Sequence, residues 1–407
     1  FTGIIAPLAF RGLWEYPIGL SLAAALILWA LFRDDDPRLQ RPYVWLPFAV
    51  FWVMALGPKY MQHAGWSGIF PTDEFFLNAL LLALPVLTAS LFWMEHEDLI
   101  PARPGFWFTR VSLALVAAFF AFTLYLQATT ESGKLLIQAR NFYGVLKVRE
   151  HNPEIPMSRY YELIHGRIVH GLQYQHRDQR ALLATYYTHG SGLGVAIKNH
   201  PRRTSGGMRL GAVGMGVGTV AAYARGGDVI RFYEINPQVV RLNLHEHAVF
   251  TYLKDSTGRS EVVLGDARLS MERELEEKRP QQYDVLILDA FSSDAIPVHL
   301  LTAQAFDVYL KHLRDDESVI AVHISNRAVD LKPVLAGIAR KFGLYAIWVN
   351  QEAIGDRLFA SDWIILSRSP RTLSAVDFKK DGKPLPTLED PPLWTDDYSD
   401  LFSLIKH

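Results

Sequence analysis

The sequence lacks cysteine and carries almost no net charge. Its 407 residues include no Cys, and 41 Lys and Arg offset 42 Asp and Glu, which leaves a formal net charge of −1. The absence of cysteine excludes disulfides, thiolate nucleophiles and cysteine metal ligands. Near-neutrality argues against nucleic acid as the main partner, because nucleic-acid-binding domains usually carry a strongly basic surface. The length suits two or three domains.

Long apolar runs are concentrated in residues 1–130. Four of them are free of charged residues, and each is close to the roughly 20 residues that cross a bilayer as a helix. Trp and Tyr near their ends are typical of membrane interfaces. We therefore expect about four transmembrane helices in contact with a lipid bilayer; a buried helix bundle is the alternative. The four runs are residues 16–32, 43–58, 75–94 and 111–130.

The start of the chain has neither a Met nor a basic leader. We therefore expect Phe1 to follow further membrane spans in a longer protein. The run at 43–58 is the weakest of the four, because Pro47 interrupts it.

A glycine-rich turn is the most informative motif. The apolar residues 210–213 predict a strand, and Gly214, Gly216 and Gly218 follow it. Glycines let the backbone turn tightly and come close to a ligand. A tight turn without a ligand is the alternative reading of this stretch alone.

The residues after the turn extend the motif. Residues 220–224 suit the start of a helix, and 229–233 predict a second strand with Glu234 at its end. An acid in this place can accept both hydroxyls of a ribose. The order of strand, glycine turn, helix, strand and acid therefore predicts a nucleoside-containing cofactor.

Two further strands also end in carboxylates. Asp266 follows the predicted strand 261–264, and Asp289 follows 283–288. In open α/β sheets, ligands bind at the carboxyl ends of the strands. We therefore expect Glu234, Asp266 and Asp289 to converge on one pocket.

The part after residue 130 divides into three predicted segments. Residues 131–190 contain short strands at 140–148, 160–164 and 166–173, which indicate a small antiparallel β unit. Strand–helix alternation in 191–370 predicts a Rossmann-like, doubly wound sheet of the methyltransferase type. Its last two strands, 344–349 and 362–367, are too close in sequence for a helix between them, so they are expected to pair antiparallel. Residues 371–407 fit a C-terminal tail, with Asp396 and Asp397 solvated.

These motifs resemble the spermidine synthase (polyamine aminopropyltransferase) family over about residues 140–370. The apolar front also looks like that of membrane-fused bacterial spermidine-synthase-like proteins. The resemblance implies a transferase that moves the aminopropyl group of decarboxylated S-adenosylmethionine to a polyamine such as putrescine. No metal is expected, because the sequence has no carboxylate–histidine cluster. The matching residues are 166–173, 186–187, the glycine turn, Glu234, 265–267 and 289–294.

The resemblance also implies roles for single residues. For the nucleoside, Glu234 matches the acid that binds the ribose, Asp266 and Ala267 match the adenine-binding pair, and Gln173 matches the glutamine that closes over it. Three residues match the catalytic group. Tyr187 matches a tyrosine at the junction of cofactor and acceptor, Asp289 matches the proton-accepting carboxylate, and Asp294 is its candidate second acid, with helix capping as the alternative.

The expected partners are a polyamine or other small amine, a lipid bilayer and a second copy of the chain in a homodimer. We place the protein in the inner membrane as a multi-pass protein with a cytoplasmic catalytic domain, because nucleoside cofactors are found in the cytoplasm. The arginines of the loop at 33–41 run against the positive-inside tendency.

Departures from the family pattern keep two other functions open. Val217 stands where the family usually has an aspartate that holds the aminopropyl end, and Thr188 stands where it usually has glutamine. An acid in place of Val217 would disfavour the carboxylate of ordinary S-adenosylmethionine, so its absence motivates an S-adenosylmethionine-dependent methyltransferase as the alternative. The apolar front motivates a non-enzymatic membrane protein that binds a nucleoside or a polyamine.

Three histidines complete the candidate residues. His165 and His170 fall five apart on a predicted strand and should point to opposite faces, so a metal site is not expected there. His323 ends an apolar run, 319–322, and should face the same crevice as the acids. A plain loop is the alternative for residues 323–326.

Overall fold

The structure is a computed structural model of the chain, which divides into two compact units, Phe1–Ser132 and Gly133–His407. In the first unit, residues 18–23 and 25–26 are described, and they are helical. The second unit contains both sheets found in the described residues. The structure describes residues 18–23, 25–26, 133–166, 168–244, 246, 248–291, 297–326, 328–353, 355, 358–386 and 388–406.

The expected transmembrane bundle in residues 1–130, and with it the inner-membrane location, needs correction. None of the helices in the described part of the chain is both long enough and apolar enough to span a bilayer. Apart from residues 18–23 and 25–26, the four apolar runs lie outside the described residues. Apolar composition over a sufficient length does not by itself establish a spanning helix. The fold class therefore rests on the α/β part alone.

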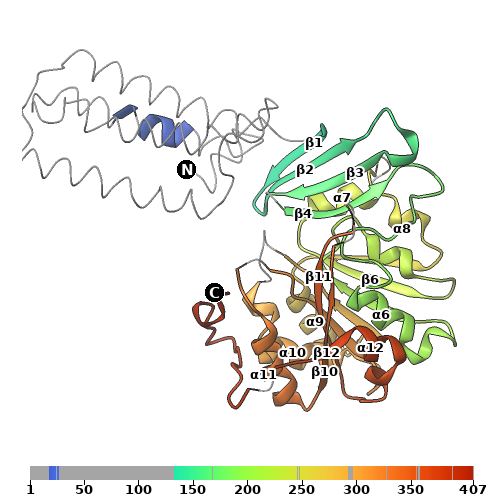
Figure 1. The fold of residues 1–407 in the computed structure, drawn as a ribbon, viewed down its shortest axis with the longest axis vertical. Coiled ribbons are helices and arrows are strands. Elements are labelled where there is room, and N and C mark those ends of the chain that lie inside the picture. The colour runs from blue at the N-terminus through green and yellow to red at the C-terminus, as the bar shows by residue number, and fades with distance from the viewer. Residues whose placement is uncertain are drawn as a thin grey trace, which may run out of the picture. The chain divides into compact units, whose positions relative to one another are not determined.

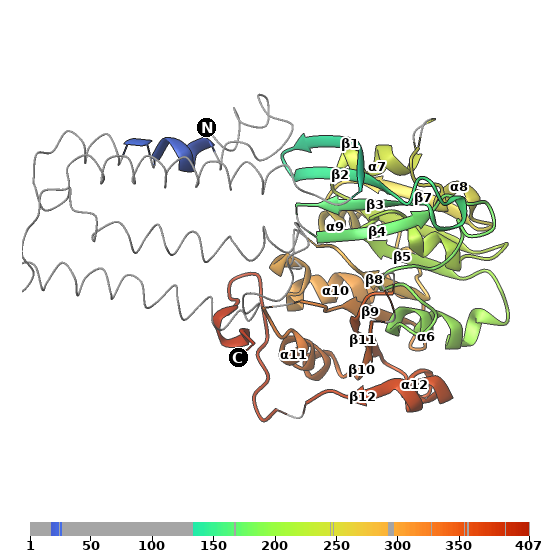
Figure 2. The same cartoon turned by 45° about the horizontal axis from the view of Figure 1, so that its top comes forward.

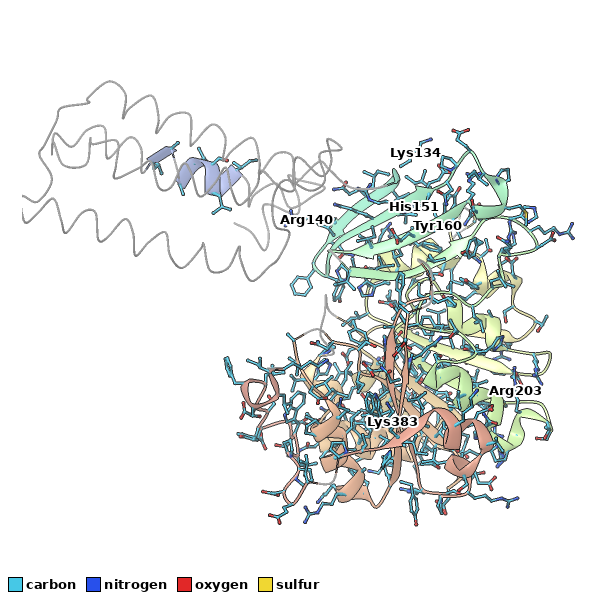
Figure 3. All side chains as sticks on the ribbon, in the orientation of Figure 1. Lys134, Arg140, His151, Tyr160, Arg203 and Lys383 are labelled. Carbon is cyan, nitrogen blue, oxygen red and sulfur yellow. The ribbon has the colours of Figure 1, made fainter. Side chains whose placement is uncertain are left out.

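The small sheet contains four antiparallel strands in the order β1-β2-β3-β4. The predicted single strand 140–148 is wrong, because the chain reverses between β1 and β2. Asn141 Oδ1 accepts a hydrogen bond from the Tyr143 backbone N–H at 3.0 Å, which closes the turn. On the same sheet His151 stacks on Tyr160 with ring centroids 4.6 Å apart (Figure 3). The strands are β1 (Lys134–Asn141), β2 (Gly144–His151), β3 (Tyr160–His165) and β4 (Ile168–Tyr174).

The large sheet has eight strands in the order β12-β10-β11-β9-β8-β5-β6-β7. The five from β9 to β7 are parallel, and numbered along the chain they have the 3-2-1-4-5 order of doubly wound nucleotide-binding sheets. β10 and β11 pair antiparallel, as the sequence predicted. The strands are β5 (Arg209–Val213), β6 (Val229–Glu234), β7 (Arg259–Leu264), β8 (Val285–Leu288), β9 (Val319–His323), β10 (Tyr345–Gln351), β11 (Ser361–Ser367) and β12 (Gly382–Pro384).

Helices cover both faces of the large sheet (Figures 1 and 2). Side chains of α6, α7, α8 and α12 pack into one core, and those of α9, α10 and α11 pack into the other. The helices are α6 (Gly192–Asn199), α7 (Pro237–Leu244), α8 (Tyr252–Asp255), α9 (Ala267–Glu276), α10 (Ala303–Lys311), α11 (Lys332–Phe342) and α12 (Val376–Asp381). The described residues also form short 3-10 helices: η1 (Pro156–Ser158), η2 (Pro201–Arg203), η3 (Thr219–Tyr223), η4 (Val298–Leu300), η5 (Thr372–Ser374) and η6 (Phe402–Leu404).

The central strand β8 is apolar throughout because it faces a core on both sides. In β8, Val285 and Ile287 belong to one core, whereas Leu286 and Leu288 belong to the other. This two-sided burial is typical of parallel sheets with helices on both faces. The first core also contains Leu146 from β2, so the small sheet is packed against the large one. Asn141 Nδ2 adds a polar link between the sheets, donating to Asn236 Oδ1 at 2.7 Å.

Two segments differ from their predicted form. The helix expected after the glycine turn is only the 3-10 helix η3, because Ala224 already has an extended backbone and β6 starts at Val229. The expected tail is anchored at Trp394, whereas Asp396 and Asp397 are exposed, as the sequence predicted. The Trp394 side chain is buried in the second core, and Asp396 accepts two hydrogen bonds from the Arg268 guanidinium at 2.7 and 2.6 Å.

Candidate active site

A cavity of about 330 Å³ lies at the carboxyl ends of the parallel strands. The cavity lies next to the ends of β5 and β8, which are neighbours at the centre of the sheet. After β5 the chain continues to β6 on one side, and after β8 it continues to β9 on the other side. Doubly wound sheets bind ligands at such a point. The size of the cavity falls within the range of small-molecule sites. Both sheets contribute to its wall. The lining includes Phe142, Tyr143, Leu146, Leu163, His165, His170, Tyr186, Tyr187, Gly214, Met215, Gly216, Glu234, Asn236, Asp266, Ala267, Asp289, Phe291 and His299.

The glycine turn forms the floor of the cavity. Gly214 has φ +93°, and a Cβ there would lie 2.3 Å from the Asp289 carbonyl oxygen. Gly216 has φ +54°, and its Cβ would lie 2.8 Å from the His170 carbonyl oxygen. Both positions therefore require glycine. The third, Gly218, starts η3 and does not line the cavity.

The residue where the family has an aspartate, Val217, does not face the cavity either. Its side chain is buried in the first core, directly against Gly171 of β4. Thr188, the other departure, donates from Oγ1 to Gln351 Oε1 at 2.7 Å and is absent from the lining.

Glu234 lines the cavity at the end of β6. Its Oε2 accepts from the Met215 backbone N–H at 3.0 Å, and its Oε1 accepts from that of Asn236 at 2.8 Å. Burial raises the pKa of this carboxyl above its ordinary value. Each oxygen retains acceptor capacity beyond its backbone bond, so a pair of adjacent hydroxyls fits the group.

Asp266 and Ala267 lie together at the start of α9 and both line the cavity. Asp266 Oδ1 caps the helix by accepting from the Leu269 N–H at 2.9 Å. Its Oδ2 lies 3.0 Å from His299 Nε2. His299 is a cavity residue that the sequence reasoning missed, since nothing in its local pattern distinguishes it.

Asp289 is at the centre of the polar network. The Tyr187 hydroxyl donates to Asp289 Oδ2, and His323 Nδ1 lies 2.6 Å from Asp289 Oδ1. Burial, and then the negative charge of Asp289, raise the pKa of Tyr187 well above its ordinary value, so it stays a donor. The structure thus brings the two predicted catalytic residues together. The third, Asp294, lies outside the described residues.

The network continues from His323 away from the cavity. His323 Nε2 lies 2.8 Å from Ser325 Oγ, which accepts from the Asp362 N–H at 2.8 Å. The imidazole is sandwiched between the rings of Tyr186 and Trp363, with centroids 4.5 and 4.6 Å away. Ser325 does not line the cavity, so this Asp–His–Ser chain does not present a nucleophile to it.

Gln173, the predicted nucleoside-closing residue, lies away from the cavity. It is fully buried, and its Nε2 donates to Arg180 O at 3.0 Å and to Thr251 Oγ1 at 3.1 Å. Its Oε1 accepts from the Thr251 N–H at 2.8 Å. The amide therefore joins β4 to the segment before α8.

The predicted opposite facing of His165 and His170 is wrong. Both line the cavity, with ring centroids 5.4 Å apart. They lie on the two strands of the β3–β4 hairpin rather than on one strand, and a register shift between Leu163 and Ile164 leaves His170 as the extra residue. Such a bulge redirects a side chain. Burial lowers the pKa of His170 to about 4, so its ring is neutral at pH 7.

The charges on the cavity wall are all negative. Glu234, Asp266 and Asp289 line it, and no Lys or Arg is found among its described lining residues. Within the described ranges there is also no group of three or more His, Asp or Glu side chains arranged to hold a metal ion. The three carboxylates therefore favour a cationic ligand that donates hydrogen bonds.

No family model matches the sequence, and no curated protein matches it significantly. Some solved structures are similar to parts of the chain. A Corynebacterium glutamicum protein assigned as a spermidine synthase has 15% identity and a TM-score of 0.41, over 58% of this chain and 80% of its own. A Bacillus cereus O-methyltransferase in complex with SAH has 16% identity and a TM-score of 0.30, over 44% and 81%. A Streptococcus mutans protein assigned as an S-adenosylmethionine-dependent methyltransferase has 12% identity and a TM-score of 0.36, over 65% and 67%.

Similarity at this level does not identify a family. The assignment of a Rossmann-like, doubly wound sheet rests on the strand order itself.

Proposed function

We propose that the chain is a transferase that moves the aminopropyl group of decarboxylated S-adenosylmethionine to a polyamine such as putrescine. The observation that carries the proposal is the position of Asp289. Its carboxylate is held by Tyr187 and His323 and lines the same cavity as Glu234. A proton acceptor and a candidate ribose acceptor thus face one ligand.

The chemistry needs alignment more than acid catalysis. The acceptor nitrogen attacks the carbon next to the sulfonium, a C–N bond forms, and the C–S bond breaks with its electron pair going to sulfur. The leaving group, methylthioadenosine, is neutral and needs no proton. The nitrogen must lose a proton, and Asp289 is the group that anchors the ammonium and takes that proton as attack begins.

The charge on the cavity wall supports the decarboxylated co-substrate. Decarboxylated S-adenosylmethionine carries a sulfonium and an ammonium, whereas the ordinary form also carries a carboxylate. Three carboxylates and no Lys or Arg among the described lining residues favour the form without the carboxylate.

Methyl transfer from ordinary S-adenosylmethionine is the second candidate. The observation in its favour is Val217, which is buried against Gly171 and leaves the glycine turn without an acid at the cavity. An acid there would repel the methionine carboxylate, so its absence removes one obstacle to the ordinary cofactor.

The test is a paired assay with the purified chain. One reaction contains decarboxylated S-adenosylmethionine and putrescine, and the other contains ordinary S-adenosylmethionine with the same amine. Mass spectrometry that finds spermidine and methylthioadenosine in the first reaction supports the proposal. Methylated amine in the second reaction alone would favour methyl transfer, and no product with any diamine in either reaction would contradict both.

Two variants locate the activity in the cavity. Glu234→Gln removes the charge of the candidate ribose acceptor, and product formation should fall because nucleoside binding weakens. Asp307→Asn changes an exposed acid of α10 that pairs only with Lys311, and it should leave product formation unchanged.

A further inference from the structure

We propose that His323 is a positioning residue for Asp289 and that Ser325 supports the tautomer in which His323 acts. In this arrangement His323 carries its proton on Nδ1 and donates it to Asp289 Oδ1, while Ser325 donates its hydroxyl proton to Nε2. The kinetic part of the inference rests on the proposed function, whereas the tautomer is testable without any ligand.

The direction of each hydrogen bond follows from Asp362. A backbone N–H can only donate, so Ser325 Oγ must accept from the Asp362 N–H, at 2.8 Å. The hydroxyl oxygen keeps a second acceptor position, but the acceptor that the contacts of the described residues give the Ser325 hydroxyl proton is His323 Nε2, 2.8 Å away. Nε2 then accepts, and a neutral imidazole that accepts at Nε2 carries its proton on Nδ1. At 2.6 Å from Asp289 Oδ1, that proton is donated to the carboxylate.

The imidazole has little freedom to turn. Its ring makes angles of 28° with Tyr186 and 18° with Trp363, which lie on its two faces, and Phe291 meets it at 70°. The side chain of His323 is 5% exposed. Because both nitrogens are bonded and both faces are covered, the ring orientation fixes the plane of the Asp289 carboxylate.

The arrangement makes Asp289 an acceptor toward the cavity. Oδ1 accepts from His323 and Oδ2 accepts from Tyr187, so both protein partners donate to the carboxylate. Each oxygen keeps one further acceptor position. A ligand group that meets Asp289 must then be a donor, as the nitrogen of an amine acceptor is.

The tautomer is tested by nitrogen NMR of the ¹⁵N-histidine-labelled chain. We expect His323 in the wild type to be the neutral Nδ1–H form. Ser325→Ala should move the Nε2 resonance from its wild-type position, because that nitrogen loses its donor, and Ser325→Thr, which keeps the hydroxyl, should retain the wild-type pattern. An Nε2–H or doubly protonated His323 in the wild type at neutral pH would overturn the inference, whether or not the protein transfers an aminopropyl group.

The positioning role is tested with three substitutions that separate the bonds of His323. An Asn amide reaches about as far as Nδ1, a Gln amide reaches about as far as Nε2, and Phe keeps only the stacking. We expect His323→Asn to retain aminopropyl transfer to putrescine within about tenfold, and His323→Gln and His323→Phe to lower kcat about 100-fold. Affinity for methylthioadenosine should stay within about twofold in all three. Equal losses in all three variants would overturn the role.

His312→Asn is the matched control. His312 is also fully buried and uses both nitrogens, with Nδ1 accepting from the Gln281 N–H and Nε2 donating to Met271 O, both at 3.0 Å. It does not line the cavity. This variant should lower thermal stability and leave kcat per folded molecule unchanged. Should the wild type transfer no aminopropyl group, the kinetic arm fails with the proposed function, and the NMR arm still decides the tautomer.

Discussion

Tyr187 and Asp289 are 102 positions apart in the chain, yet the tyrosine hydroxyl donates a hydrogen bond to the aspartate carboxylate. Tyr187 comes from the segment between β4 and α6, and Asp289 from the end of β8. The bond therefore joins the segment that leaves the small sheet to the centre of the large sheet.

Tyr187→Phe tests the hydroxyl. The variant keeps the ring and removes one of the two protein donors to Asp289, so we expect the transfer rate to fall by about 10- to 100-fold, on the order of 1.5–3 kcal/mol for a hydrogen bond to a charged group. Affinity for methylthioadenosine, measured by calorimetry, should change less than threefold. A wild-type rate would show that the bond is dispensable.

Asp289→Asn tests the carboxylate. The amide has nearly the same shape but cannot take a proton from the acceptor amine, so turnover should fall below detection. Nucleoside affinity should remain within about tenfold, roughly 1.4 kcal/mol. Asp307→Asn serves as the control. Loss of nucleoside binding in the Asp289 variant would mean that the residue holds the fold rather than the reaction.

Gly214→Ala tests the glycine turn. A side chain at φ +93° is strained, and its Cβ would lie 2.3 Å from the Asp289 carbonyl oxygen. We expect a loss of unfolding free energy of about 2 kcal/mol or more, together with loss of transfer, because the Asp289 backbone must move. Gly226→Ala is the matched control, since a Cβ there has nothing within 4 Å. Urea unfolding gives the free energy of both variants. An equal loss in Gly226→Ala would show that the cost does not come from the position of Gly214.

Gln173→Ala distinguishes the family-derived role from the observed one. Its amide bonds only to protein groups, so the variant should lose about 1–3 kcal/mol of stability and leave nucleoside affinity unchanged. Gln304→Ala removes an exposed amide that accepts from the Asp396 N–H, and should cost less than about 0.5 kcal/mol. A Gln173 variant of full stability but weak nucleoside binding would restore the role that the resemblance implies.

His200 predicts a dependence of stability on acidity. Burial lowers its pKa from 6.5 to about 4, so the folded protein holds it neutral where the unfolded chain would protonate it. Stability is therefore present above pH 6.5 and is lost as the pH falls toward 4, by about 2 kcal/mol between pH 7 and pH 5. His200→Asn keeps an acceptor for the Arg202 N–H and cannot take up a proton, so its stability should fall less over this range. Urea titrations of the wild type and the variant at pH 7 and pH 5 provide the measurement. An equal loss of unfolding free energy in the two proteins would contradict the prediction.

Three parallel strands of the large sheet could be predicted with their acids, because β6 ends in Glu234, β7 is followed by Asp266 and β8 is followed by Asp289. Glu234, Asp266 and Asp289 then meet because parallel strands present their carboxyl ends at one edge. The link between Asp289 and His323 could be predicted only in part. It depends on β8 and β9 being neighbours, a property of strand order that no local pattern encodes.

Other features depend on single residues that alternation does not reveal. The extra residue at His170 reverses the facing expected from a period of two, and the turn after Asn141 ends a run that is otherwise strand-like. Gln173 matches a family position, yet its amide bonds to Arg180 and Thr251 and does not reach the cavity. The sequence match therefore did not predict the contacts of this side chain. The prediction of transmembrane helices in residues 1–130 relied on apolar length alone, which does not define a membrane-spanning helix.

The wall of the cavity belongs to two sheets, which meet through the shared core and through the Asn141–Asn236 link. A small opening between these sheets would expose the pocket without unfolding either of them. A bound molecule that touches both walls must oppose this opening. Backbone amides in β1–β4 should then exchange their hydrogens with solvent more slowly when the pocket is filled, so the exchange rates of the small sheet report occupancy.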